Sequence, residues 1–172
     1  TICINDRLEN IAANMNRFKP GFILVVPAIA EAFYKKVMDG IASGANQRKI
    51  AFAKRINRIC SIFGIDIRRK LYISLLDKFG GNLTSIVVGG AALRQDVAEA
   101  FTEFGVNMFQ GYGLTECAPL VASNYPRGNR LGSVGKPISC MTAKIEDGEI
   151  LVKGDCVMLG YYKNPEATAE VF

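Results

Sequence analysis

Short apolar runs alternate with amphipathic stretches over the first two thirds of the chain. The runs at 22–26 and 83–88 are continuous and rich in β-branched residues, a pattern typical of strands buried on both faces. A third strand is predicted over 106–110. Helical spacing of apolar residues predicts helices in the remaining segments, namely 6–16, 27–39, 48–63, 68–79 and 94–104.

The apolar stripe of the helix predicted over 94–104 predicts where that helix packs. In 94–104 the stripe is Val97, Ala98, Phe101 and Phe104, and Gly105 ends the helix. In 27–39, Pro27 opens the helix, while 40–46 is predicted to be a loop. Because strands and helices alternate, we expect an α/β fold with a parallel sheet and crossover helices.

The pattern changes after Gly111, where Gly, Pro and Asn become frequent and the strands become short. Met141, Ala143 and Ile145 alternate in one strand, and Asp147-Gly148 predicts a two-residue hairpin turn into the next. We therefore expect three parts. They are an α/β part at 1–113, a motif loop and connection at 114–131, and a β-rich, partial-barrel lobe at 132–172. Both ends look cut, as in an internal fragment of a longer protein.

The amino-acid composition excludes several kinds of chemistry. The 172 residues include 21 basic and 16 acidic side chains, and the net charge of +5 is too small to argue for nucleic acid. Histidine is absent, which excludes His-based catalysis and most zinc sites. Five scattered cysteines indicate reduced thiols in a cytoplasmic protein. The basic segment Arg48–Lys70 is either a peripheral membrane contact or, more commonly for such a segment, the solvated side of a core helix.

Two glycine-rich segments follow consecutive predicted strands, namely Gly89–Ala92 and Gly111–Glu116. In a parallel sheet both would open at the same edge, where ligands bind. Tyr112 offers a face for stacking on a flat ring, the Thr115 hydroxyl suits a phosphate oxygen, and the Glu116 carboxylate suits Mg²⁺. Taken alone, such glycines also serve ordinary turns. The residues by themselves therefore predict a nucleotide–phosphate–Mg²⁺ site without naming a reaction.

Several segments in fixed order resemble motifs of the adenylate-forming (AMP-binding) superfamily. Gln110–Glu116 resembles its YGxTE motif, and Gly89–Leu93 resembles its GGAPL turn, with Ala92 in place of the usual proline. Further segments are similar to the family's later motifs, namely Gly132–Pro137, Gly148–Gly154 and Gly160–Thr168. Lys19–Val37, the basic stretch at about 40–80 and Leu114 resemble the long-chain fatty acyl-CoA synthetase branch.

This resemblance implies a ligase that uses ATP, Mg²⁺ and coenzyme A to activate a fatty acid. It implies that Gly89, Gly90, Ala91 and Ala92 line one side of the adenine pocket and that Gln110, Gly111, Tyr112 and Gly113 line the other. Thr115 would hold the α-phosphate and Glu116 would bind Mg²⁺. The phosphate-binding loop, the ribose-binding Asp and the catalytic Lys of the family would lie in the rest of the parent chain, so these 172 residues alone are expected to be inactive. An acyl-AMP ligase that delivers to a carrier protein and an inert interaction domain of the same fold remain alternatives.

Overall fold

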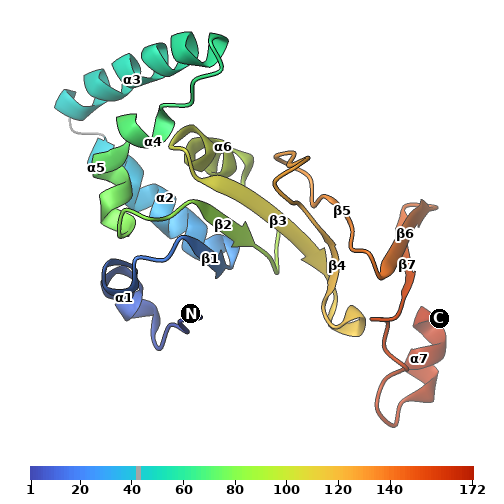
Figure 1. Ribbon diagram of the computed structural model, residues 1–172. Helices are drawn as coiled ribbons and strands as arrows, with labels where there is room; N and C mark the ends of the chain where they lie inside the picture. Colours follow the sequence, from blue (N-terminus) through green and yellow to red (C-terminus); the bar gives the residue numbers. More distant parts are fainter. Residues whose placement is uncertain (42–43) are drawn as a thin grey trace.

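The computed structural model describes residues 1–41 and 44–172, and a five-stranded sheet is its centre (Figure 1). The first three strands are parallel and the last two pairings are antiparallel. In sheet order the strands are β1 (Phe22–Val25), β2 (Ser85–Val88), β3 (Asn107–Gly113), β4 (Leu120–Ser123) and β5 (Lys136–Pro137). A separate antiparallel hairpin consists of β6 (Met141–Glu146) and β7 (Glu149–Gly154). The predicted α/β class, with a parallel sheet and a smaller β-rich part, is confirmed.

The helices follow the sequence pattern with local corrections. They are η1 (Leu8–Asn10), α1 (Ile11–Phe18), α2 (Pro27–Ile41), α3 (Gly44–Ile62), α4 (Arg68–Leu71), α5 (Ile73–Leu76), η2 (Asp77–Phe79), α6 (Gln95–Glu103), η3 (Thr115–Cys117) and α7 (Pro165–Val171). The prediction of a single helix over 68–79 is wrong. The segment forms the short helices α4 and α5, which are separated at Tyr72, followed by the 3-10 helix η2. The loop predicted over 40–46 is wrong at 40, 41 and 44–46, which are helical, and residues 42 and 43 lie outside the described part.

The main core lies between α2, α6 and the parallel strands. All four residues of the predicted stripe, Val97, Ala98, Phe101 and Phe104, are buried. The Phe101 ring lies 6.2 Å from the ring of Phe104 and 6.2 Å from that of Phe79. Aromatic rings at these separations bury large apolar areas and add favourable ring–ring contacts. This cluster fixes α6 against β2 and β3 and so positions the ends of those strands.

The prediction that 22–26 is buried on both faces is wrong. Ile23 and Val25 pack against the main core, whereas Phe22 is 57% exposed and Leu24 is 71% exposed. β1 is one of the two edge strands of the sheet, and successive side chains of a strand point to opposite faces. The core contacts therefore use only one face of β1, and its other apolar face stays open in this chain.

The strand predicted over 106–110 is longer than its pattern suggested. β3 continues through Gly113, and from Gly111 onward it pairs antiparallel with β4. The glycine segment therefore begins inside a strand instead of forming a turn after it, and the predicted connection 114–131 contains the strand β4. β5, beyond residue 131, also joins the large sheet. The division into three parts stays a prediction.

The hairpin predicted at Asp147-Gly148 is confirmed. Both residues have positive φ, +51° and +87°, as expected for the two-residue turn that matches the twist of paired strands. Met141 is buried in a second, smaller cluster with Cys117 and Val121. Ile145, near the turn, is 78% exposed. The hairpin is thus anchored at its open end, next to the predicted motif loop.

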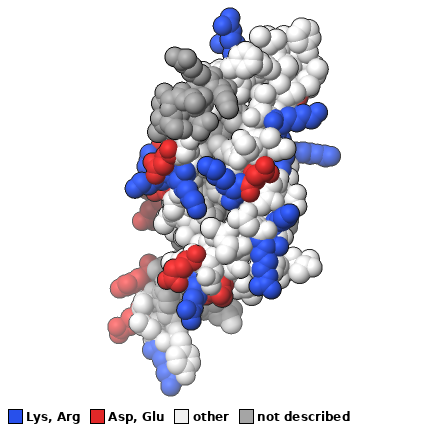
Figure 2. All heavy atoms as spheres, turned by 90° about the vertical axis from the view of Figure 1, so that its left-hand side faces the viewer, with Lys and Arg blue, Asp and Glu red and all other residues white. Residues whose placement is uncertain are grey.

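The outer surface mixes charges of both signs. Figure 2 shows lysine and arginine side chains spread over one face, with acidic side chains among them. Within residues 1–41 and 44–172, no helix combines the length and apolar character needed to cross a bilayer.

Candidate functional site

The two predicted segments lie side by side at the carboxyl edge of the parallel strands. Val88, the last residue of β2, is in register with Gln110 of β3. The Gln110 side-chain oxygen accepts a hydrogen bond from the Leu93 backbone N–H at 3.4 Å. A Cβ atom added to Gly89 would lie 3.9 Å from the carbonyl oxygen of Gly111. The structure therefore brings the first segment together with Gln110 and Gly111, the start of the second segment, at the sheet edge where α/β proteins bind ligands.

The first segment forms a small, open turn. The Gly89 N–H donates to the carbonyl of Val25 at 3.3 Å, which ties the turn to β1. Gly90 has a φ of +91°, which lies in the region that favours glycine. Ala91 and Ala92 are exposed. Small side chains on an exposed turn leave the backbone accessible to a flat ligand.

The two glycines of the second segment differ in how much room their neighbours leave. A Cβ on Gly111 would lie 3.2 Å from Cδ1 of Leu120 on β4. A Cβ on Gly113 would overlap the carbonyl oxygen of Pro119, and that carbonyl accepts the Leu114 N–H at 2.7 Å. Close packing of β3 on β4 therefore requires glycine at 113, whereas at 111 the end of the Leu120 side chain would only need to shift by a few tenths of an ångström. The role of both glycines in lining the nucleotide pocket stays a prediction.

Tyr112 lies between the two packing clusters of the molecule. Its side chain is half-buried and packs against the smaller cluster, which includes Cys117 and Met141. In a strand, residues two apart share a face, so Tyr112 follows Gln110 on the side of the Gly89–Ala92 turn. This anchoring restricts the ring without covering it fully. Stacking of Tyr112 on a bound base stays a prediction.

Glu116 is held by a segment far along the chain. Its carboxylate Oε1 accepts a hydrogen bond from the Tyr161 hydroxyl at 2.6 Å, and its backbone carbonyl accepts the Met158 N–H at 2.7 Å. The bond from Tyr161 is the main cause that lowers the pKa of Glu116 below its ordinary value. The carboxylate is therefore ionised at neutral pH, and it lies one residue after the exposed Thr115.

These residues fit a magnesium ion that also binds substrate phosphates. Mg²⁺ prefers hard oxygen ligands and commonly takes one or two carboxylates together with phosphate oxygens. Glu116 supplies an ionised carboxylate, and the hydrogen bond from Tyr161 goes to Oε1 and not to the second oxygen. No group of three acidic, thiol or imidazole side chains among the described residues could hold a metal alone. A metal at Glu116 would thus depend on a phosphate-bearing ligand.

Cys117 is not a nucleophile in this arrangement. Its side chain is buried in the smaller cluster, and burial is the main cause that raises the pKa of its thiol. A buried, protonated thiol is a poor nucleophile. Its position after Glu116 serves packing.

Sequence reasoning missed two residues that support the site. Tyr161 contacts Glu116 from 45 positions away and borders an open hollow of about 800 Å³ beside α7. Asn124 is buried, and its backbone N–H donates to the Gln110 carbonyl at 2.9 Å, while its side-chain amide donates to the Ser133 carbonyl. Neither contact has a signal in local spacing, because each joins segments that meet only in the folded chain.

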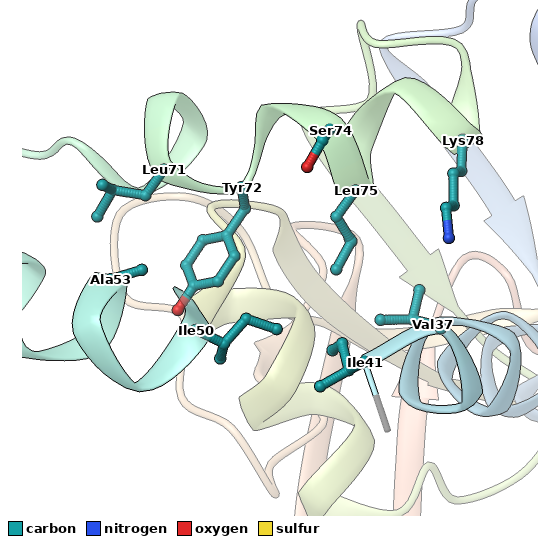
Figure 3. Close-up of a pocket in the computed structure, with 10 residues that line it drawn as sticks. Val37, Ile41, Ile50, Ala53, Leu71, Tyr72, Ser74, Leu75 and Lys78 are labelled. Carbon is teal, nitrogen blue, oxygen red and sulfur yellow. The ribbon is translucent and has the colours of Figure 1, made fainter. Parts of the chain in front are cut away.

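A cavity of about 430 Å³ lies at the opposite end of the parallel strands, between α2, α3 and α5 (Figure 3). Its wall is mainly apolar, with Val37, Ile41 and Leu75 among the lining residues, and Ser74 and Lys78 add polar atoms. No predicted site residue lines it. The candidate site is therefore distinct from this cavity and lies on an open edge.

Comparison with known proteins agrees with the motifs. Residues 2–162 match the model of the family described as AMP-binding enzyme. A long-chain-fatty-acid–CoA ligase of Mycobacterium bovis is 29% identical over 186 residues, which cover 100% of this chain and 31% of that protein. A probable chloroplastic acyl-activating enzyme of Arabidopsis thaliana is 44% identical over 210 residues, covering 92% of this chain and 29% of that protein.

The fold is also similar to a crystal structure, that of a long-chain-fatty-acid-CoA ligase from Archaeoglobus fulgidus. The TM-score is 0.65 at 18% identity, and the match covers 96% of this chain and 31% of the other. The chain thus spans about a third of the length of these relatives. Motif order, site geometry and the family match agree, and the chain belongs to the AMP-binding enzyme family.

Proposed function

We propose that the complete protein is an ATP-dependent, AMP-forming long-chain fatty acid–CoA ligase. The observation that carries this proposal is that the Gly89–Ala92 turn meets Gln110 and Gly111 at the sheet edge, and that the chain continues from there to the ionised carboxylate of Glu116. The relatives named as long-chain-fatty-acid–CoA ligases support the choice of substrate. A cytoplasmic location is part of the same proposal.

The proposed reaction needs no protein nucleophile. A fatty carboxylate oxygen attacks the α-phosphorus of ATP, and pyrophosphate leaves to give an acyl-adenylate. The thiolate of coenzyme A then attacks the acyl carbonyl, and AMP leaves. Positioning and charge stabilisation therefore carry most of the catalysis, which agrees with a chain that has no histidine.

Each site residue takes a binding role in this scheme. Gly89, Gly90, Ala91 and Ala92 form one wall for the adenine, and Gln110, Gly111, Tyr112 and Gly113 form the other. The Thr115 hydroxyl donates to an α-phosphate oxygen. Glu116 would hold Mg²⁺, which supplies positive charge at the phosphates when bound.

Replacing Glu116 tests this assignment. We expect Glu116→Gln to lower palmitate-driven ATP–pyrophosphate exchange by about 100-fold, the effect typical of losing one electrostatic contact to the reacting group. Glu149→Gln, an exposed glutamate at the start of β7, is the matched control and should exchange like the wild type. If Glu116→Gln also exchanges like the wild type, the metal role of Glu116 is wrong.

The acceptor of the acyl group separates the alternatives. Coenzyme A and a phosphopantetheine-bearing carrier protein are added in turn to preformed acyl-adenylate, and release of AMP is followed. We expect coenzyme A to be the faster acceptor, whereas preference for the carrier would favour an acyl-AMP ligase. Absence of any exchange in the complete protein would favour an inert interaction domain. The 172 residues alone should bind ATP weakly and should not catalyse exchange.

Helix α3 is the proposed contact with an anionic membrane surface. It contains five basic residues and no acidic ones. Phe52, Ile59 and Ile62 are exposed, and their spacing of seven and three residues places them along one side of the helix. Apolar side chains flanked by arginines on one helix are typical of segments that lie in a lipid interface.

Vesicle co-sedimentation tests this contact. The complete protein should bind vesicles of phosphatidylglycerol and phosphatidylcholine, with binding weakened by salt. The variant with Phe52→Ala and Ile59→Ala should lose most of this binding. Tyr162→Ala removes an exposed aromatic ring outside α3 and should bind normally. Equal binding by both variants would show that α3 is merely solvated.

A further inference from the structure

Two cysteine thiols meet at the open end of the β6–β7 hairpin. Cys140 directly precedes β6, and Cys156 lies just beyond β7, inside a turn closed by the hydrogen bond from the Val157 N–H to the Gly154 carbonyl at 3.2 Å. The two Sγ atoms are 3.4 Å apart, and both side chains are partly exposed. Their separation of 16 positions gives no motif, so only the fold reveals the pair.

We propose that Cys140 and Cys156 are a reversible redox pair that forms a disulfide on reaction with a small-molecule disulfide such as oxidised glutathione. One cysteine thiolate attacks the glutathione disulfide, which gives a protein–glutathione mixed disulfide and releases one glutathione thiolate. The second cysteine, as its thiolate, then attacks the protein sulfur of the mixed disulfide. A Cys140–Cys156 bond forms, a second glutathione thiolate leaves, and the two protein thiols are oxidised as one glutathione disulfide is reduced.

The surrounding backbone favours this reaction. An S–S bond is about 2.05 Å long, so the sulfurs need to approach each other by little more than 1 Å. Cys140 is fixed, because its carbonyl lies against Gly154 where a Cβ would overlap it, and Met141 is in register with Gly154. Cys156 lies in the turn beyond the ladder and can make the remaining movement.

The other cysteines do not compete for this pairing. Cys117 belongs to the same cluster, but its side chain is buried, so a small-molecule disulfide does not reach its sulfur. Cys3 is near the start of the chain and Cys60 is on α3, in other parts of the molecule. Selectivity for Cys140 and Cys156 therefore follows from proximity.

The pair is connected to the candidate site. Two residues after Cys156, the Met158 N–H donates to the Glu116 carbonyl, and the Tyr161 hydroxyl donates to the Glu116 carboxylate. A disulfide that pulls Cys156 toward Cys140 displaces this segment and with it Glu116. We expect the oxidised protein to catalyse ATP–pyrophosphate exchange severalfold more slowly, a consequence that rests on the proposed function.

Peptide mapping tests the disulfide directly. The complete protein is equilibrated with reduced and oxidised glutathione, alkylated and digested with trypsin. Residues 131–144 carry Cys140 and residues 154–163 carry Cys156, and we expect a cross-linked pair of these peptides that dithiothreitol separates. Full alkylation of both cysteines under oxidising conditions, or mixed glutathione disulfides alone, would overturn the proposal.

Serine variants keep the two parts of the inference separate. Cys140→Ser and Cys156→Ser should each abolish the cross-link and make exchange insensitive to oxidised glutathione, while Cys60→Ser should behave like the wild type. A cross-link that leaves the exchange rate unchanged would overturn the coupling to Glu116. Absence of exchange in the fully reduced wild type would instead contradict the proposed function, and the peptide map would still decide the disulfide.

Discussion

The two packing clusters of this molecule differ in size and in what they position. The main core joins helices to parallel strands and contains the aromatic group of Phe79, Phe101 and Phe104. Among the described residues, the smaller cluster has Cys117, Val121 and Met141 as its buried members, and they come from η3, β4 and β6. Buried apolar area is the main source of stability, so the main core dominates the folding free energy.

Strand β3 connects the two clusters. Met108 lies in the main core, whereas Tyr112, four residues later, packs on the smaller cluster. The Gly89–Ala92 turn is tied to the first, and Glu116 with its partner Tyr161 lies beside the second. The candidate site therefore spans a boundary between a strongly packed region and a weakly packed one. Substitutions in the main core should mainly lower stability, whereas substitutions in the smaller cluster should mainly lower activity.

The largest loss of stability is expected for Phe101→Ala. Phe101 is fully buried, and truncation of a buried phenylalanine costs about 3–5 kcal/mol through lost contacts and the cavity left behind. Urea titration followed by circular dichroism measures the change. Phe172→Ala, at an exposed position, should change the free energy of unfolding by less than about 0.5 kcal/mol. A similar loss in both variants would contradict the dominance of the main core.

Met141→Ala should cost less stability than Phe101→Ala but more activity. Met141 is buried, and its truncation costs about 2 kcal/mol, the low end for such changes, because the cluster is small and can relax. The same cluster supports Tyr112 and Cys117, so ATP–pyrophosphate exchange measured on the folded protein should fall more than in Phe101→Ala. If exchange is normal in folded Met141→Ala, the smaller cluster does not position the site.

The sequence predicted those features that depend on local spacing. The apolar stripe of α6, the Asp147-Gly148 turn and the alternation of strands and helices each follow from periodicity or turn chemistry over a few residues. The meeting of the two glycine segments followed from a topological rule for parallel sheets, without any residue contact being known.

Other features depend on distant parts of the chain. The exposed face of β1 could not be read from its apolar run, because burial depends on which elements cover a strand. Likewise, the continuation of β3 through Gly113 requires β4 as its partner. Tyr161, Asn124 and the Cys140–Cys156 pair make contacts between segments that are far apart in sequence, so local spacing carries no signal of them.

The smallest expected effect is a shift in pH dependence in Tyr161→Phe. This change removes the donor that lowers the pKa of Glu116, so the pKa of Glu116 should rise toward its ordinary value. The carboxylate keeps its charge only above its pKa. The acid limb of ATP–pyrophosphate exchange should therefore move to higher pH. Stability should change little because Tyr161 is partly exposed, and the rate at neutral pH should change little because Glu116 stays ionised there.

Exchange measured across the acid range checks this shift, with Tyr162→Phe as the matched control on the neighbouring exposed ring. The control should keep the wild-type profile, since its hydroxyl does not contact Glu116. An unchanged acid limb in Tyr161→Phe would mean that the protonation of Glu116 does not govern exchange. The weakly packed region would then position the Glu116 carboxylate, but the pKa of that carboxylate would have no effect on exchange. The two regions would differ in how they place the site residues and not in how they set protonation.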